Sequence, residues 1–283
     1  MIKSLTPILL LLCYNIGFSQ TKAYEIYTHK GKKITFEKML KNLENQDIVL
    51  FGEYHNNPIS HWLELEITKE LHEKRKLTLG AEMLEADNQI AVNFFLKDSI
   101  NQKGLDTQAR LWNNYKTDYA PLVNFAKKNA LPFIATNIPR RFASGVYKKG
   151  FSYLDSLSLK EKKWVAPLPI YYDSTLPSYQ NILKMMGDHG SPKLVMAQAC
   201  KDATMAHFIY KNYVPGNLFL HYNGAYHSNN YEGILWYLKR LNSKLNYSTL
   251  STVSQKNIHK LKEENIGLAN FIICVDEDMT PTY

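Results

Sequence analysis

Short apolar runs alternate along this chain with longer stretches of helical periodicity, and this alternation constrains the fold more than any other feature of the sequence. It is typical of βαβ units, in which each strand returns through a helix and the strands lie parallel. The runs predicted as strands are residues 47–51, 77–82, 132–136, 217–222, 246–252 and 270–275. Helices are predicted at residues 35–43, 60–75, 87–96, 121–129, 192–213 and 231–241. We therefore expect an α/β fold with a largely parallel sheet flanked by helices.

Residues 140–190 interrupt the alternation. They contain no convincing strand, and aromatic residues and prolines gather between residues 167 and 179. We interpret this segment as a small helical subdomain or cap over one end of the sheet. The α/β core then comprises residues 20–139 and 191–283. A chain of this length buries enough apolar surface to fold without a metal or disulfides.

Residues 1–19 are predicted to be a secretory signal peptide, because a positive residue precedes the apolar run 7–13 and small residues follow it. Leu12 stands directly before Cys13, where a lipoprotein signal carries a small residue. We therefore expect an exported protein, periplasmic or secreted, with a mature N-terminus near Gln20 and no lipid anchor. No later apolar run reaches the roughly 18 residues of a membrane helix.

The chain is basic, with 34 Lys and Arg against 26 Asp and Glu and a formal charge of +8. The lysines are scattered or occur in short groups, which is typical of a solvated surface. No nucleic-acid-binding module is recognisable in the sequence. We therefore expect no nucleic-acid partner.

Polar residues follow several of the predicted strands, at the edge where open α/β sheets form their sites. Glu53 and His55 come after the first predicted strand, and Glu82 ends the second. His227 follows a later strand, and both histidines are the fourth residue of a stretch that begins with glycine. Carboxylates and histidines from neighbouring strand ends recur in sites that bind a cation or move protons. The alternative is that these side chains only face water.

A second set of polar residues would suit an anionic ligand. Asn137, Arg140 and Arg141 follow the third predicted strand. Guanidinium groups match carboxylates and phosphates, although a pair with surface acids is an equal alternative. Gln198 and Asp202 lie one turn apart on the apolar face of a predicted helix. They either join the same site or bond to nearby backbone.

Standard catalytic signatures are missing from the sequence. There is no Gly-x-Ser-x-Gly elbow, phosphate-binding P-loop, Gly-x-Gly-x-x-Gly fingerprint or Cys-x-x-Cys pair. Their absence disfavours serine hydrolases, kinases and nicotinamide-dependent enzymes.

A set of motifs runs in order through residues 47–241: Gly52-Glu53-x-His55 with Asn57-Pro58, Glu82, Trp112, Tyr119-x-Pro121-Leu122, Asn137-Ile138-Pro139-Arg140, Gln198, Asp202-x-x-Met205-Ala206 and Gly224-x-x-His227. Together they resemble the ChaN-like haem-binding uptake proteins, in a wider group with the Tiki proteases and the erythromycin esterases. The resemblance implies an exported bacterial protein with an α/β core and a small helical domain, linked to haem or iron acquisition. In the wider group, the residues matching Glu53, His55, Glu82 and His227 form a metal-dependent or acid–base hydrolytic centre. Family members are often lipoproteins, and this sequence departs from them before Cys13.

The composition supplies what a haem site requires. Haem needs an apolar, aromatic slot, cations for its propionates and often a His, Met, Cys or Tyr ligand to iron. The chain has 19 tyrosines, and Tyr171 and Tyr172 lie in the predicted helical segment, with Arg140 and Arg141 at its start. We expect these four residues to contribute to haem binding. Outer-membrane uptake machinery and a second copy of the chain are the expected protein partners.

Two other functions are compatible with the same residues. In a hydrolase, His55 and His227 would hold a divalent metal with Glu53 or Glu82, and the other acid would be the general base for water. In a pure interaction protein, these residues would have no chemical role.

Overall fold

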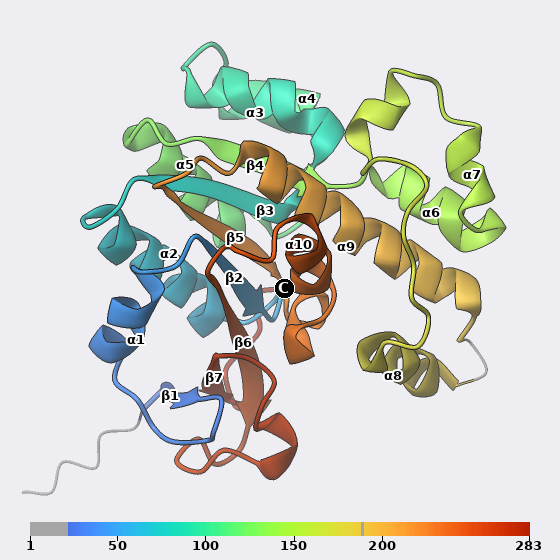
Figure 1. Cartoon of the computed structure of the whole chain (residues 1–283). Coiled ribbons are helices and arrows are strands. Elements are labelled where there is room, and N and C mark those ends of the chain that lie inside the picture. The colour runs from blue at the N-terminus through green and yellow to red at the C-terminus, as the bar shows by residue number, and fades with distance from the viewer. Residues whose placement is uncertain (1–21, 188–189) are drawn as a thin grey trace, which may run out of the picture.

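One seven-stranded sheet runs through the centre of the molecule (Figure 1). The computed structural model describes residues 22–187 and 190–283. The strands are β1 (Tyr24–Thr28), β2 (Ile48–Glu53), β3 (Leu77–Glu85), β4 (Phe133–Asn137), β5 (Leu218–Gly224), β6 (Tyr247–Gln255) and β7 (Phe271–Asp276). Their order across the sheet is β1-β7-β6-β2-β5-β3-β4. The edge strand β1 runs antiparallel to β7, and the other neighbouring pairs are parallel.

Helices cover both faces of the sheet, because successive residues of a strand point to opposite faces. The helices are α1 (Phe36–Leu43), α2 (Pro58–His72), α3 (Gln89–Leu96), α4 (Gln102–Gln108), α5 (Ala120–Lys128), α6 (Arg140–Lys149), α7 (Ser152–Asp155), α8 (Pro177–Met186), α9 (Pro192–Asn212) and α10 (Ile234–Leu241). Val49 and Phe51 of β2 belong to one core with α1, α2, α3 and α5. Ile48 and Leu50 of the same strand belong to a second core with α9 and α10.

The segment after β4 forms a third layer outside α9. Phe142 of α6 packs with Cys200 of α9, and Tyr179 of α8 packs with Val195 near the start of α9. In Figure 1, α6, α7 and α8 accordingly lie beyond α9, on the side away from the sheet. This segment has helices and turns but no strand among its described residues, in agreement with its expected helical character.

The expected α/β class with a largely parallel sheet is confirmed, and each of the six predicted strands is present. Sequence reasoning missed β1, a short edge strand with the sequence YEIYT. It also placed the start of α2 two residues late. The carboxamide oxygen of Asn57 accepts a hydrogen bond from the backbone N–H of Ser60 at 2.9 Å, and Pro58 takes the first turn, so the helix begins at Pro58.

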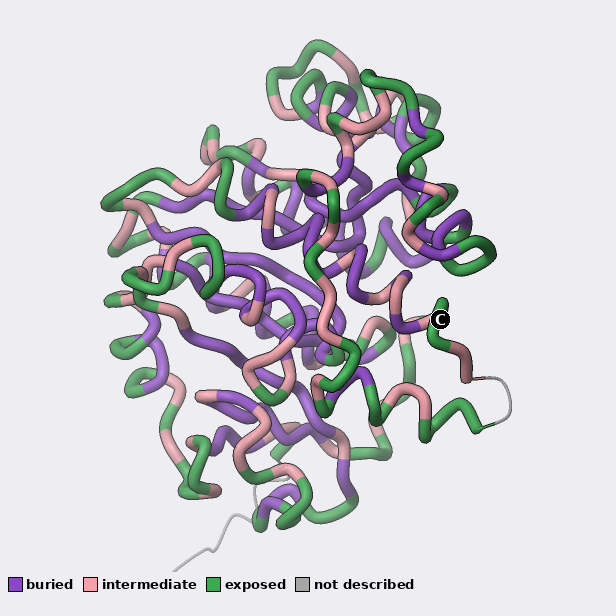
Figure 2. The backbone as a smooth tube through the Cα atoms, turned by 45° about the vertical axis from the view of Figure 1, so that its right-hand side comes forward, coloured by how far each residue is buried: buried purple, intermediate pink, exposed green. Residues whose placement is uncertain are grey.

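Burial follows this layered arrangement. Figure 2 shows buried backbone along the strands and the inner sides of the helices, with exposed segments at the loops and the outer helices. No helix of the described residues has the length and apolar character to span a membrane. The predicted signal peptide and Cys13 lie outside the described residues.

Candidate functional site

The carboxyl ends of β2, β5, β3 and β4 lie side by side at one edge of the sheet, because these four neighbouring strands are parallel. Glu53 is the last residue of β2, and Gly224 is the last residue of β5. Glu82 lies within β3, and His227 ends a short 3₁₀ turn after β5. This topology brings together residues that are far apart in the sequence.

Glu53 is a buried carboxylate with several donors around it. Nδ1 of His55 lies 2.7 Å from its Oε1, and the hydroxyl of Tyr119 donates to the same oxygen at 2.9 Å. Burial alone would raise the pKa of Glu53, but hydrogen bonds from His55 and His61 lower that pKa to about 2. Glu53 is therefore ionised at neutral pH. Its charge in turn raises the pKa of His55 against the opposing effect of burial.

His227 lies between two carboxylates. Its Nε2 is 3.1 Å from Oε1 of Glu82, and its Nδ1 bonds to Oδ1 of Asp202. The other oxygen of Asp202 accepts a hydrogen bond from the hydroxyl of Tyr179 at 3.0 Å. Burial opposes protonation of the imidazole, yet the two negative charges raise the pKa of His227 to about 9. The ring is therefore an imidazolium at neutral pH. Burial would raise the pKa of Glu82, but this neighbouring positive charge lowers it.

Gly224 separates the two histidine–carboxylate groups. Its backbone N–H donates to Oε2 of Glu82 at 2.8 Å. A Cβ at this position would lie 2.7 Å from Nε2 of His55, which is too close for any side chain unless His55 moves. Glycine therefore allows His55 and Glu82 to approach the same stretch of backbone.

Behind Glu53, the structure adds His61, Glu64 and Asp118, which sequence reasoning missed, and Tyr119, which was part of the motif set. His61 and Glu64 of α2 are buried against Glu53, and Asp118 and Tyr119 come from a π-helical turn, η2 (Tyr115–Tyr119), which leads into α5. A detectable signal was the recurrence of polar His61, Glu64 and Thr68 on one face of α2, at spacings of three and four residues. One ligand atom from each of Glu53, His61 and Glu64 lies within 4.8 Å of the others, a spacing at which the three side chains could hold a metal ion.

A pocket of about 570 Å³ opens above this centre. Glu53, His55, Gln198 and His227 line its polar side. Its apolar side consists of Ile182, Met185 and Met186 of α8 with Leu194 of α9 and Tyr226. The volume and the apolar lining are within the range of small-molecule sites.

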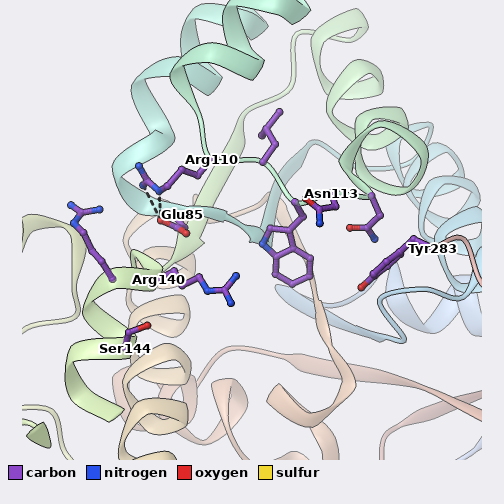
Figure 3. A pocket seen from close by; sticks show the side chains of 10 residues that line it. Glu85, Arg110, Asn113, Arg140, Ser144 and Tyr283 are labelled. Carbon is purple, nitrogen blue, oxygen red and sulfur yellow. Dashed lines mark hydrogen bonds and ion pairs between the residues drawn. The ribbon is translucent and has the colours of Figure 1, made fainter. Parts of the chain in front are cut away.

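A second pocket of about 750 Å³ adjoins the first, and Tyr283 lines both. Arg140 and Tyr283 point toward the same space from opposite sides (Figure 3). Arg110, on the same rim, pairs with Glu85 at 2.8 Å. Arg140 has no carboxylate partner within 4.0 Å among residues 22–187 and 190–283 and is left to meet an anion.

Other predicted site residues have different surroundings. Arg141 lines the second pocket but is paired with Asp87 at 2.6 Å, as the alternative interpretation expected. Asn137 is buried at the end of β4, and its Oδ1 has no hydrogen-bond partner among the described residues. Tyr171 stacks on Trp236 at 5.5 Å, outside both pockets.

Of the two remaining predicted residues, one lies away from the pockets and the other lies in the site. Tyr172 packs on Tyr179 and Phe151 and also lines neither pocket. Gln198 does reach the site, because its side-chain amide lies 2.9 Å from Nδ1 of His227. Of the predicted set, the structure thus brings together Glu53, His55, Glu82, His227 and Gln198, with Arg140 on the adjoining rim.

The arrangement can do two things chemically. The two adjoining pockets can take a ligand that has apolar and anionic parts, because the first has an apolar wall and the second is lined by Arg140. The floor can hold or transfer a proton, because Nδ1 of His55 is bonded to Glu53 and the His55 ring lines the pocket.

Comparisons with known proteins match the chain to one family model and to solved structures of similar fold. A family model described as haem-binding uptake, Tiki superfamily, ChaN matches residues 39–238. The structure describing cofacial haem binding to ChaN of Campylobacter jejuni is similar in fold: its identity is 19%, the match covers 89% of this chain and 97% of that one, and the TM-score is 0.66. A protein of Bacillus cereus matches at 12% identity over 84% of this chain and 90% of its own, with a TM-score of 0.50. No curated protein matches the chain.

Proposed function

The chain belongs to the ChaN family of haem-binding uptake proteins in the Tiki superfamily, and from this membership we propose that it binds haem at the carboxyl edge of its sheet. The observation that carries the proposal is that two adjoining pockets, which share Tyr283, differ in the polarity of the residues that line them. One has an apolar wall of Met185, Met186, Ile182 and Leu194, and the other presents the guanidinium of Arg140, which has no carboxylate partner among the described residues. A porphyrin needs both, because its ring is apolar and its propionates are anionic.

Haem bound here would contact the apolar residues of α8 in the first pocket, and Arg140 would meet a propionate. Tyr283 and Tyr226 add aromatic surface to the walls. Met185, Met186 and Tyr226 line the pocket with atoms of the classes that can ligate haem iron. The side chains present therefore fit the group.

The cellular role extends the proposal. We propose that the chain is exported to the periplasm or secreted, since its first residues have the pattern of a signal peptide. There it would contribute to haem or iron uptake together with outer-membrane machinery. A second copy of the chain is a further proposed partner, because a flat ligand bound at an open edge can be covered by another subunit.

Haem titration with matched arginine variants tests the binding proposal. We expect the mature protein to shift the Soret band saturably at micromolar ferric haem. Arg140→Ala should weaken binding by roughly tenfold to a hundredfold, because a charge-assisted hydrogen bond contributes about 1.5 to 3 kcal/mol. Arg141→Ala is the control, since that guanidinium is held by Asp87, and its affinity should remain within about threefold.

Two results would contradict the proposal in different ways. The absence of a saturable spectral change would remove haem binding altogether. Equal losses in Arg140→Ala and Arg141→Ala would retain haem binding but remove the specific propionate contact, since both side chains would then act only through general charge.

A hydrolase remains the second candidate, because a buried acid–base centre faces the pocket. His55 is bonded to Glu53 and lines the pocket, which is the placement of a general base that acts on water beside a bound substrate. In the metal-dependent form proposed from the sequence, His55 and His227 with Glu53 or Glu82 would hold the ion and polarise the water. Hydrolysis of ester or peptide substrates by haem-free protein, lost in His55→Ala and retained in Arg140→Ala, would favour this function over haem binding.

A further inference from the structure

Behind the pocket floor, three buried side chains converge on one point that the proposed haem site does not use. Nδ1 of His61 lies 3.0 Å from Oε2 of Glu53 and 3.3 Å from Oε2 of Glu64. One ligand atom from each of the three residues lies within 4.8 Å of the others. The group shares Glu53 with the strand-end centre, while His61 and Glu64 come from α2.

Two carboxylate oxygens in this group have unmet bonding capacity. Oε1 of Glu64 is buried and receives no hydrogen bond among the described residues, and Oε2 of Glu53 is buried with Nδ1 of His61, at 3.0 Å, as its one partner there. Glu53 and Glu64 are both buried, so two acids share this space at a cost. Buried acids are normally paired or bound to a metal. The single imidazole of His61 lies between both acids, so it cannot satisfy the hydrogen bonding and charge of the two carboxylates fully.

The spacing matches the edges of a metal coordination shell. Ligand atoms about 2.0 to 2.2 Å from a tetrahedral Zn²⁺ are about 3.3 to 3.6 Å from one another. The separations of 3.0 and 3.3 Å from Nδ1 of His61 to the two carboxylates need only small movements to reach that value. A fourth position would remain for water, as in sites with three protein ligands.

The far side of the His61 ring has the support that metal-binding histidines have. Its Nε2 lies 3.2 Å from the carbonyl oxygen of His55 and 3.5 Å from Oδ2 of Asp118. Asp118 is held in turn by hydrogen bonds from Asn114 and Thr282, each at 2.7 Å. A carboxylate or carbonyl that accepts the distal N–H fixes the tautomer and the orientation of a ligating imidazole.

We propose that Glu53, His61 and Glu64 form a binding site for a divalent transition cation, Zn²⁺ or Mn²⁺, with Asp118 orienting His61. Mixed imidazole and carboxylate ligands suit these ions. The site is distinct from the metal set expected from the sequence, in which His55 and His227 were the nitrogen ligands. Glu53 connects it to the pocket, because a cation bound at Oε2 would fix the carboxylate whose Oε1 is bonded to His55. Metal binding at this site does not depend on haem binding.

Metal titration of haem-free, EDTA-treated full-length protein tests the site. We expect one equivalent of ZnCl₂ or MnCl₂ to bind with micromolar or tighter affinity by calorimetry, with the metal content checked by elemental analysis. Glu64→Gln should weaken binding by more than the tenfold to hundredfold typical of losing an outer-sphere partner, and Asp118→Asn should weaken it by an amount within that range. Glu70→Gln, an exposed acid on the same helix, is the matched control and should bind as the wild type does.

Two results would exclude a cation at Glu53, His61 and Glu64. A full equivalent of metal in Glu64→Gln with unchanged affinity would place the cation elsewhere, for example at His55 and His227, and would overturn the proposal. No binding by the wild type at tens of micromolar metal would also overturn it and leave the three residues as an ion-pair cluster. Circular dichroism establishes that the variants are folded. If Glu64→Gln does not fold, Asp118→Asn decides, because unchanged affinity in that variant would contradict the role given to His61.

Discussion

The turns that follow β2 and β5 carry the same spacing of glycine, two residues and histidine, but their histidines have different surroundings. After β2, the His55 side chain is 35% exposed, lines the pocket and has one carboxylate partner, Glu53. After β5, the His227 side chain is 7% exposed and lies between Glu82 and Asp202. A shared local motif therefore does not give a shared chemical state, because the neighbouring strands and helices supply the charges.

The difference assigns the two rings to different tasks. His227 is a fixed cation that compensates two buried acids, since its pKa is raised to about 9. His55 has only one charged partner in direct contact and keeps a face toward the pocket, so a ligand or a water molecule can reach it. The turn after β5 thus stabilises the site, and the turn after β2 exposes the His55 ring to ligands in the pocket.

Removing His227 should have the largest effect on stability. His227→Asn leaves Glu82 and Asp202 buried without their cation, and breaking a buried ion pair in this way costs about 3 to 5 kcal/mol. Urea unfolding at pH 7 measures the change. His259→Asn, at an exposed histidine, should stay within about 0.5 kcal/mol. A cost under about 1 kcal/mol for His227→Asn would remove the distinction between the two turns.

The same ion pair should make stability depend on pH in a defined direction. The pKa of His227 is raised to about 9 in the folded protein, against about 6.5 when unfolded. Its contribution is therefore complete below about pH 6.5 and is lost as the pH rises through about 9, and it amounts to about 3 kcal/mol. The stability difference between wild type and His227→Asn, followed from pH 6 to 10, should shrink over this window. A difference that is constant or grows with pH would contradict the assignment.

A methyl group at Gly224 should disturb the contact between the two turns. Gly224→Ala places a Cβ 2.7 Å from Nε2 of His55, and overpacking of this kind costs about 1 to 3 kcal/mol. The backbone φ of −56° suits alanine, so the contact itself is the cause. A double-mutant cycle checks this, because Gly224→Ala should cost under about 1 kcal/mol once His55→Ala has made room. Additive costs would show that the close approach does not matter.

Of the changes at the two turns, His55→Ala should affect stability least and haem affinity most. Its pair with Glu53 is partly exposed, and Glu53 retains His61 and Tyr119, so we expect a loss of about 1 kcal/mol or less. Because His55 lines the proposed haem pocket, haem affinity should fall by more than about threefold. An unchanged haem affinity in a stable His55→Ala variant would confine haem to the Arg140 pocket.

Sequence reasoning located the residues whose positions depend on strand topology. Glu53, Glu82 and His227 follow or end buried apolar runs, and parallel pairing brings such positions to one edge. It failed for Tyr171 and Tyr172, whose positions depend on how the helical segment packs on α9 and α10. Composition identified that segment as helical and aromatic. It could not show that α8 would turn Met185 and Met186, rather than the two tyrosines, toward the pocket.

His61 and Glu64 were missed for a different reason. They lie on a helix that packs against the sheet, and such a face normally carries apolar residues. Polar residues there signal a partner, but the partner, Glu53, is on a strand, and its distance is set only when α2 docks. The same limit applies to Arg140 and Arg141. The two residues are adjacent in the sequence, but only Arg141 lies close enough to Asp87 to form an ion pair.

The position of β2 in the sheet governs when the site can form during folding. Its two neighbours, β5 and β6, come from the last third of the chain, so that Ile48 pairs with Phe219 on one side and with Tyr247 on the other. Pairings over such sequence separations form slowly, because loop closure precedes the contacts that reward it. During synthesis, the backbone N–H and C=O groups on both edges of β2 therefore stay unpaired until β5 and β6 have been made. Such open edges favour aggregation. The arrangement that unites Glu53 with His227 thus also ties correct assembly of the centre to completion of the whole polypeptide.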